Sequence, residues 1–506
     1  MAANHTWETE NAAATCSGAD ESTPLLSASD QTSMADKIVG VSQQTLVSTD
    51  GQLSSHGKKL PQYLAGLAAT LGALAAGMVL GWSSPAGQDG KNLIEQYNIP
   101  MIPEEFSWVG SLATLGAGAM CVPIGILADL IGRRTSMLLM VVPFCVGWLL
   151  IIFANTVGMF YAGRFITGVS SGAFCVAAPL YTAEIAESEI RGALGSFFQL
   201  LLTIGILLTY VFGSFVSMRV LSIISAVVPL IFFGVFFFMP ETPFYYMKKG
   251  NEDAARKSLM RLRGLYYDIE SEVQMLRESI EETRRNKVSF TVAIQSRAAK
   301  KGLVIAFGLM LFQQMSGVNA IIFYASDIFE ESGTAIKPNV ATIIVGVVQV
   351  VAVFASTLFV DRLGRRILLL SSIVTLLVAT LVMGIYFYCK HNTDVFNGIE
   401  WFAIIPLCLF LIMFNFGFGP LPWMMMAEIF APEVKGIAAS SACLSNWLMA
   451  FVVTKFYVNM KHAVEPYGTF WIFSAFCAIG IFFVYFLVPE TKGKTLDEIQ
   501  RELNQG

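Results

Sequence analysis

Long apolar stretches follow one another from about residue 60 to residue 488, separated by short polar segments. A membrane-spanning helix needs about 20 mostly apolar residues to cross roughly 30 Å of hydrocarbon. Twelve stretches come near that length, and they predict spans at residues 63–84, 107–128, 136–155, 157–182, 193–216, 219–239, 302–325, 337–361, 367–389, 400–425, 437–459 and 467–488. We therefore expect an all-α membrane protein with twelve transmembrane helices.

Two longer segments lack such stretches. The first is rich in Ser, Thr, Asp and Gln, a composition typical of a disordered tail. The second lies between the sixth and seventh spans, and its alternating acids and bases indicate a solvated helix. The pattern divides the chain into a tail at 1–60, a six-helix half at 61–239, a helical linker at 240–301, a second six-helix half at 302–489 and a C-terminal tail at 490–506.

Charge in the loops predicts the orientation. The loops at 133–134 and 362–366 and the linker are rich in Arg and Lys, whereas the loops at 85–106 and 326–336 are acidic or neutral. The positive-inside rule places the basic loops and the linker in the cytosol, and an even number of spans places both termini there. The N-terminal tail lacks the charged-then-apolar pattern of a cleaved signal peptide, so the first span is expected to direct insertion.

Composition agrees with a membrane protein and excludes other classes. The hydrophobic residues make up 55% of the chain and the charged residues 14%, against about 25% charged in soluble domains. A net charge of −4 gives no support to nucleic-acid binding. The eight cysteines form no CxxC pair, and no Walker loop or HExxH string appears. We expect no cofactor, no metal ion and no enzymatic activity.

The two halves repeat three patterns in the same order. Residues 125–134 match residues 357–366, Ala183-Glu184-Ile185 matches Ala427-Glu428-Ile429, and Pro240-Glu241-Thr242 matches Pro489-Glu490-Thr491. A base follows the second pattern after the same interval in both halves, at Arg191 and at Lys435. Parallel repeats of this kind are typical of transporters whose binding site lies at the membrane midplane between the halves.

Several strings are family signatures. They are Gly163-Arg164-Phe165, Gln313-Gln314-Met315-Ser316-Gly317-Val318-Asn319, Gly419-Pro420-Leu421-Pro422-Trp423 and Ser445-Asn446-Trp447. With them, residues 60–500 resemble the sugar-porter family of the major facilitator superfamily. Within it the chain is most similar to insect facilitated trehalose transporters and animal facilitative glucose transporters. The resemblance implies the major facilitator fold and transport of a sugar by alternating access.

Amide side chains are the candidate sugar ligands. Asn and Gln donate and accept hydrogen bonds without charge, which suits a neutral molecule rich in hydroxyls. Gln314 and Asn319 lie roughly 140° apart on an ideal helix, so they share a site only if the helix breaks, and Gly317 lies between them. The resemblance implies that the sugar is bound by Gln199, Gln313, Gln314, Asn319, Gln349, Asn446 and Trp423, with Trp423 stacking on the ring. The alternative is that the amides only join helices to one another, as Asn415 also would.

Two groups of residues are candidate gates. By resemblance, Phe323 and Tyr324 belong to an outer gate, the alternative being that they are core aromatics. A charged set at the cytosolic side predicts an interdomain lock that forms when the cavity opens outward: Asp129, Arg133, Arg134, Glu184, Arg191, Glu241, Asp361, Arg365, Arg366, Glu428 and Glu490. The alternative is that these charges serve topology and weak surface pairs. Arg164, inside the fourth span, needs an acid or a carbonyl as its partner.

Three functions compete, and facilitative uniport is favoured. Proton-coupled relatives place an Asp in the first span. Ser83 occupies that position here, and a serine hydroxyl cannot titrate near neutral pH. A proton-coupled symporter and a weakly transporting sugar sensor remain alternatives, and the substrate remains open between a hexose such as glucose and the disaccharide trehalose. In the tail, Glu21, Leu25 and Leu26 form an acidic dileucine pattern. It predicts binding to a clathrin adaptor and an endosomal or lysosomal pool beside the plasma membrane.

Overall fold

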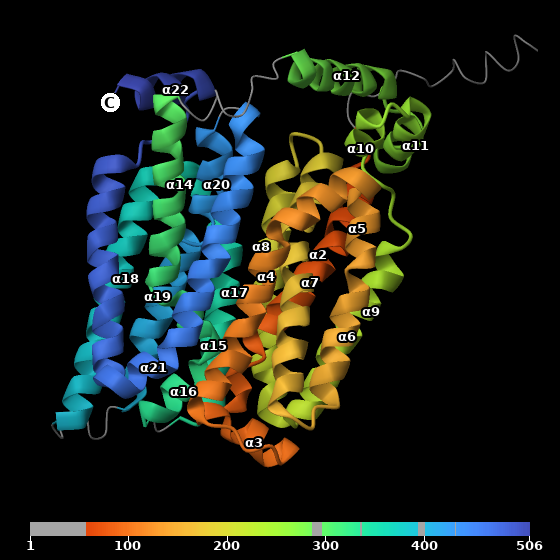
Figure 1. Ribbon diagram of the computed structural model, residues 1–506. Coiled ribbons are helices and arrows are strands. Elements are labelled where there is room, and N and C mark those ends of the chain that lie inside the picture. The colour runs from red at the N-terminus through yellow and green to blue at the C-terminus, as the bar shows by residue number, and fades with distance from the viewer. Residues whose placement is uncertain (1–56, 286–295, 334–335, 393–399, 431, 506) are drawn as a thin grey trace, which may run out of the picture. The chain divides into compact units, whose positions relative to one another are not determined.

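The computed structural model describes residues 57–285, 296–333, 336–392, 400–430 and 432–505 (Figure 1). Within these ranges every regular element is a helix, and eleven helical segments are long and apolar enough to span a membrane. The last of them, in α21 (Pro432–Leu487), is broken by non-helical backbone at Val464 and Glu465, just before Pro466, so it makes two spans. The expected twelve spans are therefore confirmed, with boundaries that differ by a few residues.

The first half contains six spans. They are α2 (Lys59–Gly81), α4 (Pro103–Ile131), α5 (Arg133–Leu139) followed by α6 (Val141–Ile152), α7 (Val157–Ile185), α8 (Arg191–Phe215) and α9 (Met218–Phe236). The loop between the first two spans holds η1 (Ser84–Ala86), η2 (Gln88–Gly90) and α3 (Lys91–Tyr97).

The linker and the second half follow. The linker forms α10 (Pro243–Lys248), α11 (Glu252–Arg263) and α12 (Ile269–Arg285). The second half contains α14 (Arg297–Met315), α15 (Val318–Phe323), α16 (Ala325–Glu331), α17 (Pro338–Leu363), α18 (Arg365–Asn392), η3 (Glu400–Ala403), α19 (Ile404–Phe416), α20 (Leu421–Ile429) and α21, and α22 (Leu496–Gln505) follows it.

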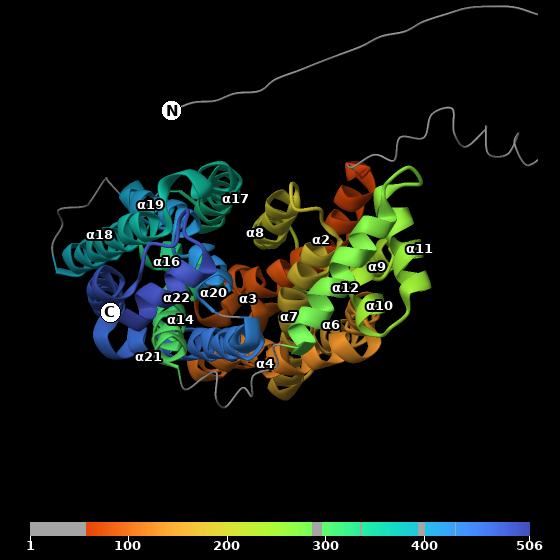
Figure 2. The ribbon, with the colours of Figure 1, turned by 90° about the horizontal axis from the view of Figure 1, so that it is seen from above.

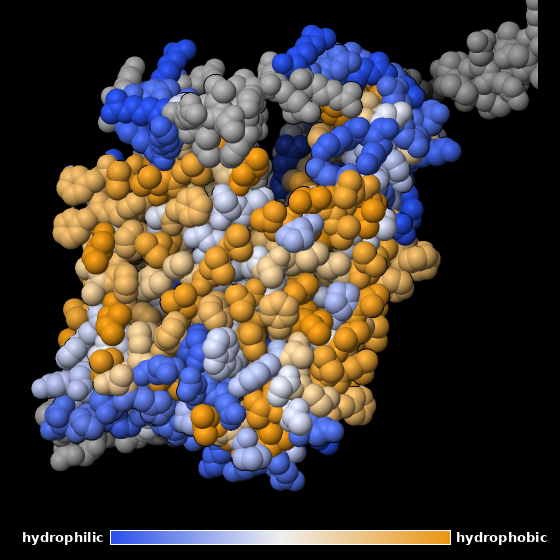
Figure 3. Space-filling view, viewed as in Figure 1, coloured by the Kyte–Doolittle hydropathy of each residue, from blue (hydrophilic) through white to orange (hydrophobic). Residues whose placement is uncertain are grey.

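Helices α4 and α21 and helices α8 and α17 pack across the boundary between the halves. Figure 2 shows α14 and α17–α21 on one side and α2 and α6–α9 on the other. We call the end that carries α10–α12 and α22 the linker end, and the opposite end, with α3 and α16, the α16 end (Figure 1). Large apolar side chains are exposed along the spans, and Figure 3 shows them as a broad band between two polar ends. A band of this kind is the surface that a bilayer covers.

The seventh span is discontinuous, as the position of Gly317 predicts. Helix α14 ends at Met315, Gly317 has a φ of 90°, and α15 starts at Val318. A left-handed residue interrupts the helical hydrogen bonds, and glycine adopts it without a steric cost. A Cβ atom at Gly317 would lie 2.5 Å from the ring of Phe473 on α21, so the neighbouring helix also requires a glycine.

We therefore expect Gly317→Ala to destabilise the protein by about 1–3 kcal/mol, because alanine is strained at this φ and would clash with Phe473. The measurement is the apparent melting temperature of the purified protein in detergent. Gly234→Ala is the matched control, since a Cβ at Gly234 in α9 meets no atom within 4 Å. Equal melting temperatures for the two variants would contradict the expectation.

Candidate substrate-binding site

Four of the predicted amides form one hydrogen-bonded network. Asn446 Nδ2 donates to Gln313 Oε1 at 2.6 Å, Gln314 Nε2 donates to Asn446 Oδ1 at 3.1 Å, and Asn319 Nδ2 donates to Gln314 Oε1 at 2.5 Å. The network joins α14, α15 and α21, and it spans the break at Gly317. The break therefore brings Gln314 and Asn319 together.

A second helix break supplies carbonyl groups to the same network. Helix α19 ends at Phe416 and α20 begins at Leu421. Gln313 Nε2 donates to the carbonyl oxygens of Phe418 and Gly419 between them, at 2.6 and 3.0 Å. Irregular backbone at membrane depth needs such partners, because the hydrocarbon offers none.

The other predicted amides lie outside this network in the described hydrogen bonds. Gln349 in α17 is buried and Gln199 in α8 is half-buried, on two helices that pack together across the halves. Asn319 is also half-buried, so it keeps accessible surface beside its bond to Gln314. Uncharged donors and acceptors of this kind suit a neutral, hydroxylated ligand.

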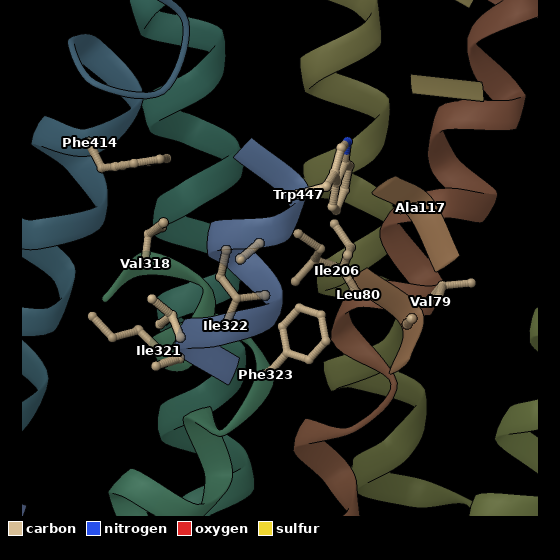
Figure 4. Packing of buried hydrophobic residues seen from close by; sticks show 14 of the residues in the cluster. Val79, Leu80, Ala117, Ile206, Val318, Ile321, Ile322, Phe323, Phe414 and Trp447 are labelled. Atoms are coloured by element: carbon tan, nitrogen blue, oxygen red, sulfur yellow. The ribbon is translucent and has the colours of Figure 1, made fainter. Parts of the chain in front are cut away.

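Two tryptophans differ in their surroundings. Trp423 in α20 is 37% exposed, whereas Trp447, next to Asn446 in α21, is 8% exposed. Among the described residues, Trp447 Nε1 and Asn415 Oδ1 are buried without a hydrogen-bond partner. Figure 4 shows Trp447 with Phe323, Ile206 and Leu80, which belong to one apolar cluster built from both halves. Sequence analysis did not assign Trp447 a role, although the Ser445-Asn446-Trp447 string contains it.

The aromatic residues predicted as an outer gate are buried at the α16 end. Phe323 and Tyr324 are buried, and Tyr324 stacks on Tyr457 with 4.9 Å between ring centroids. The backbone carbonyl of Phe323 accepts a hydrogen bond from Ser83 Oγ of the first half at 3.1 Å. Tyr210 of α8 donates to the carbonyl of Ile322 at 2.7 Å. Hydrogen bonds from both residues of the first half therefore connect it to the end of α15.

Arg164 is fully buried and bonded to carbonyls. Its Nη1 donates to Val79 O at 2.8 Å and its Nε donates to Val109 O at 3.0 Å, which ties α7 to α2 and α4. The guanidinium lies over the ring of Trp82, 5.1 Å from its centroid. The expected carbonyl partners are found, and no acid is among the partners that the structure describes for Arg164.

The charged set builds the same arrangement twice at the linker end. Glu241 Oε1 accepts the backbone N–H of Arg133 at 3.0 Å, and the Arg133 side chain binds Glu184 at 2.9 Å. Glu490 Oε1 accepts the backbone N–H of Arg365 at 2.9 Å, and the Arg365 side chain binds Glu428 at 3.3 Å. Thr242 donates to Glu184 and Thr491 donates to Glu428.

No described ion pair of this set joins the two halves, although Asp129 also pairs with Lys248 of the linker at 2.8 Å. Asp129 pairs with Arg133 at 3.0 Å, and the side chains of Arg134 and Arg366 donate to the carbonyls of Phe237 and Tyr485. Arg191 is exposed and takes part in none of the described pairs. The side chains of Asp361 and Lys435 lie outside the described residues. The lock is therefore not formed in this conformation by the pairs that the structure describes.

A family model described as "Sugar (and other) transporter" matches residues 91–503. The chain belongs to this family. The facilitated trehalose transporter Tret1 of Bombyx mori is 39% identical over 445 residues, which cover 88% of this chain and 87% of the relative. Tret1 of Drosophila grimshawi is 39% identical over 449 residues, and those residues cover 87% of this chain but only 48% of the relative. The chain thus spans about half the length of some of the sugar transporters that it matches.

Solved structures show the same fold at lower sequence identity. The proton:xylose symporter XylE bound to 6-bromo-6-deoxy-D-glucose has a TM-score of 0.71 and 24% identity, over 87% of this chain and 99% of that chain. An inward-open conformation of XylE from E. coli has a TM-score of 0.71 and 23% identity, over 86% and 98% of the two chains. The fold of this sugar-transporter family member is therefore that of the major facilitator superfamily.

Two buried lysines of α21 were not predicted as functional residues from the sequence. Lys455 donates to Ser107 Oγ of α4 at 2.6 Å and lies 4.7 Å from the ring centroid of Trp108. Lys461 pairs with carboxylates at the α16 end. The available signal was that Lys455 is the one charged residue in the span predicted at 437–459.

Glu490 gives a pH-dependent prediction. Burial raises the pKa of Glu490, but the backbone N–H groups of Lys492, Arg365 and Arg366 outweigh it and hold the pKa below its ordinary value. A carboxyl group whose pKa is lowered by folding stabilises the folded protein at pH values above its ordinary pKa. That stabilisation is lost as the pH falls through the lowered pKa. We expect Glu490→Gln to cost on the order of 1 kcal/mol at neutral pH, because solvent screens this carboxylate.

The apparent melting temperature of Glu490→Gln should lie below that of the wild type near neutral pH. The difference should shrink below about pH 4, where the ordinary glutamate pKa lies. Glu95→Gln, at an exposed position of α3, is the control and should match the wild type at both pH values. A constant difference for Glu490→Gln across the pH range would refute the role of its charge.

Proposed function

We propose that the chain transports a sugar across the membrane by facilitated diffusion, as a uniporter that opens alternately to each side. The observation that carries this proposal is the uncharged network of Gln313, Gln314, Asn319 and Asn446 at two helix breaks. The relatives named facilitated trehalose transporters support it. Gln199, Gln349 and Trp423 complete the proposed binding site from α8, α17 and α20.

The substrate is a hexose such as glucose, or the disaccharide trehalose. The trehalose transporters among the relatives favour trehalose. Gln199 favours a hexose, because it matches the pattern of glucose transporters. Both sugars offer hydroxyl groups to the same amides, so the size of the cavity separates them.

The surroundings of Arg164 favour uniport. A proton symporter needs a group that takes up a proton in one half of the cycle and releases it in the other. The partners described for Arg164 are backbone carbonyls, and Glu184 is engaged by Arg133 and Thr242. A proton-coupled symporter, like the xylose symporter of the same fold, and a weakly transporting sensor are the alternatives.

We place the linker end in the cytosol, together with both termini, by the positive-inside rule. The α16 end then faces the outside of the cell or the lumen of a vesicle. The protein resides in the plasma membrane with an endosomal or lysosomal pool. Sorting by a clathrin adaptor depends on Glu21, Leu25 and Leu26, which lie outside the described residues.

In the proposed cycle, the two ends close in turn. Phe323 and Tyr324 act as the outer gate, and their burial at the α16 end supports this role. The charged set of the linker end exchanges some of its pairs within each half for pairs between the halves when the outer end opens. A ligand shifts this equilibrium only through contacts that differ between the two states.

Transport in sealed proteoliposomes tests the proposal. Radiolabelled glucose and trehalose are supplied outside, with and without an inward proton gradient. Uptake of one of them should stop when the inside and outside concentrations are equal. Accumulation above the outside concentration, abolished by a protonophore, would show symport, and binding without uptake of either sugar would favour the sensor.

The amide network gives a second prediction. We expect Gln314→Ala and Asn319→Ala each to weaken sugar binding by about 2- to 12-fold, which corresponds to one lost hydrogen bond of about 0.5–1.5 kcal/mol. The measurement is the Kd of the transported sugar for the purified variants. Asn459→Ala, which removes an exposed amide of α21, is the control. Wild-type affinity in both network variants would remove these residues from the site.

A further inference from the structure

A buried lysine at the α16 end faces three carboxylates. Lys461 Nζ lies 2.9 Å from Glu331, 3.1 Å from Asp327 and 3.5 Å from Asp89. The side chains of Lys461 and Asp327 are each 3% exposed, that of Glu331 is 15% exposed and that of Asp89 is 27% exposed. With all four groups ionised, one positive charge faces three negative charges, and Lys461 and Asp327 are shielded from water.

Two carboxylate oxygens of this cluster lack a donor. Asp327 Oδ1 and Glu331 Oε2 are both buried and have no hydrogen-bond partner among the described residues. Oxygen atoms in that position lose their hydration without a replacement, which favours the neutral, protonated form of a carboxyl group. A proton is the ligand that supplies both the missing donor and the missing positive charge.

The groups that surround Asp327 come from every neighbouring element. Helix α21 presents Lys461, Tyr457 and His462, and His462 Nε2 lies 3.8 Å from Asp89. Glu331 is on α16 itself and Asp89 is on η2, while Lys390 of α18 donates to the backbone carbonyl of Glu331. Helices η1 and α17 contribute only uncharged groups in the described contacts. The hydroxyl groups of Ser84 and Thr342 each form a hydrogen bond with Ser326, next to Asp327. Lys461 is the cation in the ion pairs described for Asp327.

The cluster is assembled from both halves. Asp89 belongs to the loop of the first half, whereas Asp327, Glu331 and Lys461 belong to the second. Ser84 Oγ accepts the backbone N–H of Ser326 at 3.1 Å in the same contact. Separating the halves at this end therefore moves Asp89 away from Lys461 and from the two buried carboxylates, and lets water reach them.

We propose that Asp327, Glu331 and Asp89 form with Lys461 a proton-binding site, distinct from the amide network, at which one bound proton holds the α16 end closed. The proton comes from water at the α16 end and adds to Oδ1 of Asp327 or to Oε2 of Glu331, which removes one negative charge from the cluster. It returns to the same side when that end opens, so it is not carried across the membrane. It reduces the repulsion between Asp89 on one half and the acids on the other. Lys461 then pairs more effectively across the boundary.

The direction of the pH effect follows from Asp327. Burial raises the pKa of Asp327 to about 7, with Glu331 and Asp89 adding to the rise and Lys461 opposing it. Opening hydrates Asp327 and removes Asp89, and both changes lower its pKa toward the ordinary value. The state with the higher pKa gains stability as the pH falls, so acid favours the closed state. With a pKa of about 7 in the closed state, the ratio of closed to open protein should be about tenfold higher at pH 6 than at pH 8.

The test is the labelling of a cysteine that only opening exposes. Ala86 in η1 is fully buried, and η1 packs against α16, so Ala86→Cys reports the opening of this end. A maleimide is applied to the purified full chain in nanodiscs at about pH 6 and about pH 8, without sugar. The labelling rate of the unmodified chain is first subtracted. The remaining rate is divided by that of Glu95→Cys, an exposed position of α3, to correct for the ionisation of the thiol.

We expect the corrected rate to fall about tenfold from pH 8 to pH 6. Added to the reporter, Asp327→Asn should give a low rate at both pH values, since it mimics the protonated acid. If Asp327→Asn fails to fold, Glu331→Gln serves in its place and should give a lower, flatter profile. Glu104→Gln, at an exposed position of α4, should leave the pH dependence unchanged.

Two results would overturn the site. One is a corrected labelling rate of Ala86→Cys that is the same at both pH values. The other is that folded Asp327→Asn or Glu331→Gln variants keep the pH dependence of the Ala86→Cys protein. Because no sugar is present, neither result depends on the proposed transport function. A failure of the transport assay likewise leaves this test intact.

Discussion

The need to pair every backbone polar group at membrane depth governs this structure. Hydrocarbon offers no partner for a free carbonyl, so a broken helix survives only where other protein groups take over its hydrogen bonds. Gly317 breaks the seventh span, and the segment between Phe416 and Leu421 breaks the tenth. Gln313 binds the carbonyls of Phe418 and Gly419 from one break while it lies beside the other. The two breaks and the amide network therefore stabilise one another.

The same constraint explains why the network suits a ligand. Amides that only joined helices would satisfy all their groups internally, whereas Asn319 and Gln199 keep accessible surface, and Trp447 Nε1 and Asn415 Oδ1 remain unpaired. The network is thus paired internally, while Asn319 keeps surface that is open to a ligand.

The duplicated charges and the cluster around Lys461 lie at opposite ends of the protein. At the linker end, Glu241 accepts the backbone N–H of Arg133 at the start of α5, and Glu490 accepts that of Arg365 at the start of α18, so this carboxylate has a structural role in both halves. At the α16 end, Lys461 and its carboxylates have no counterpart among the repeated patterns. In the proposed transport cycle both ends separate in turn, and charged groups allow that because water readily replaces their partners when the ends open.

The sequence by itself determined the spans, the duplication and the amides. Twelve apolar stretches predicted the helices because span length depends only on the thickness of the bilayer. The string around Gly317 predicted a break because glycine adopts a left-handed backbone freely. Tertiary structure alone decided that the carbonyls of Phe418 and Gly419 meet Gln313, and that Arg164 binds carbonyls rather than an acid. It also brought Asp89, Asp327 and Lys461 together from positions hundreds of residues apart. The pattern of apolar and polar residues along the chain does not predict these contacts, because they depend on how separate helices pack.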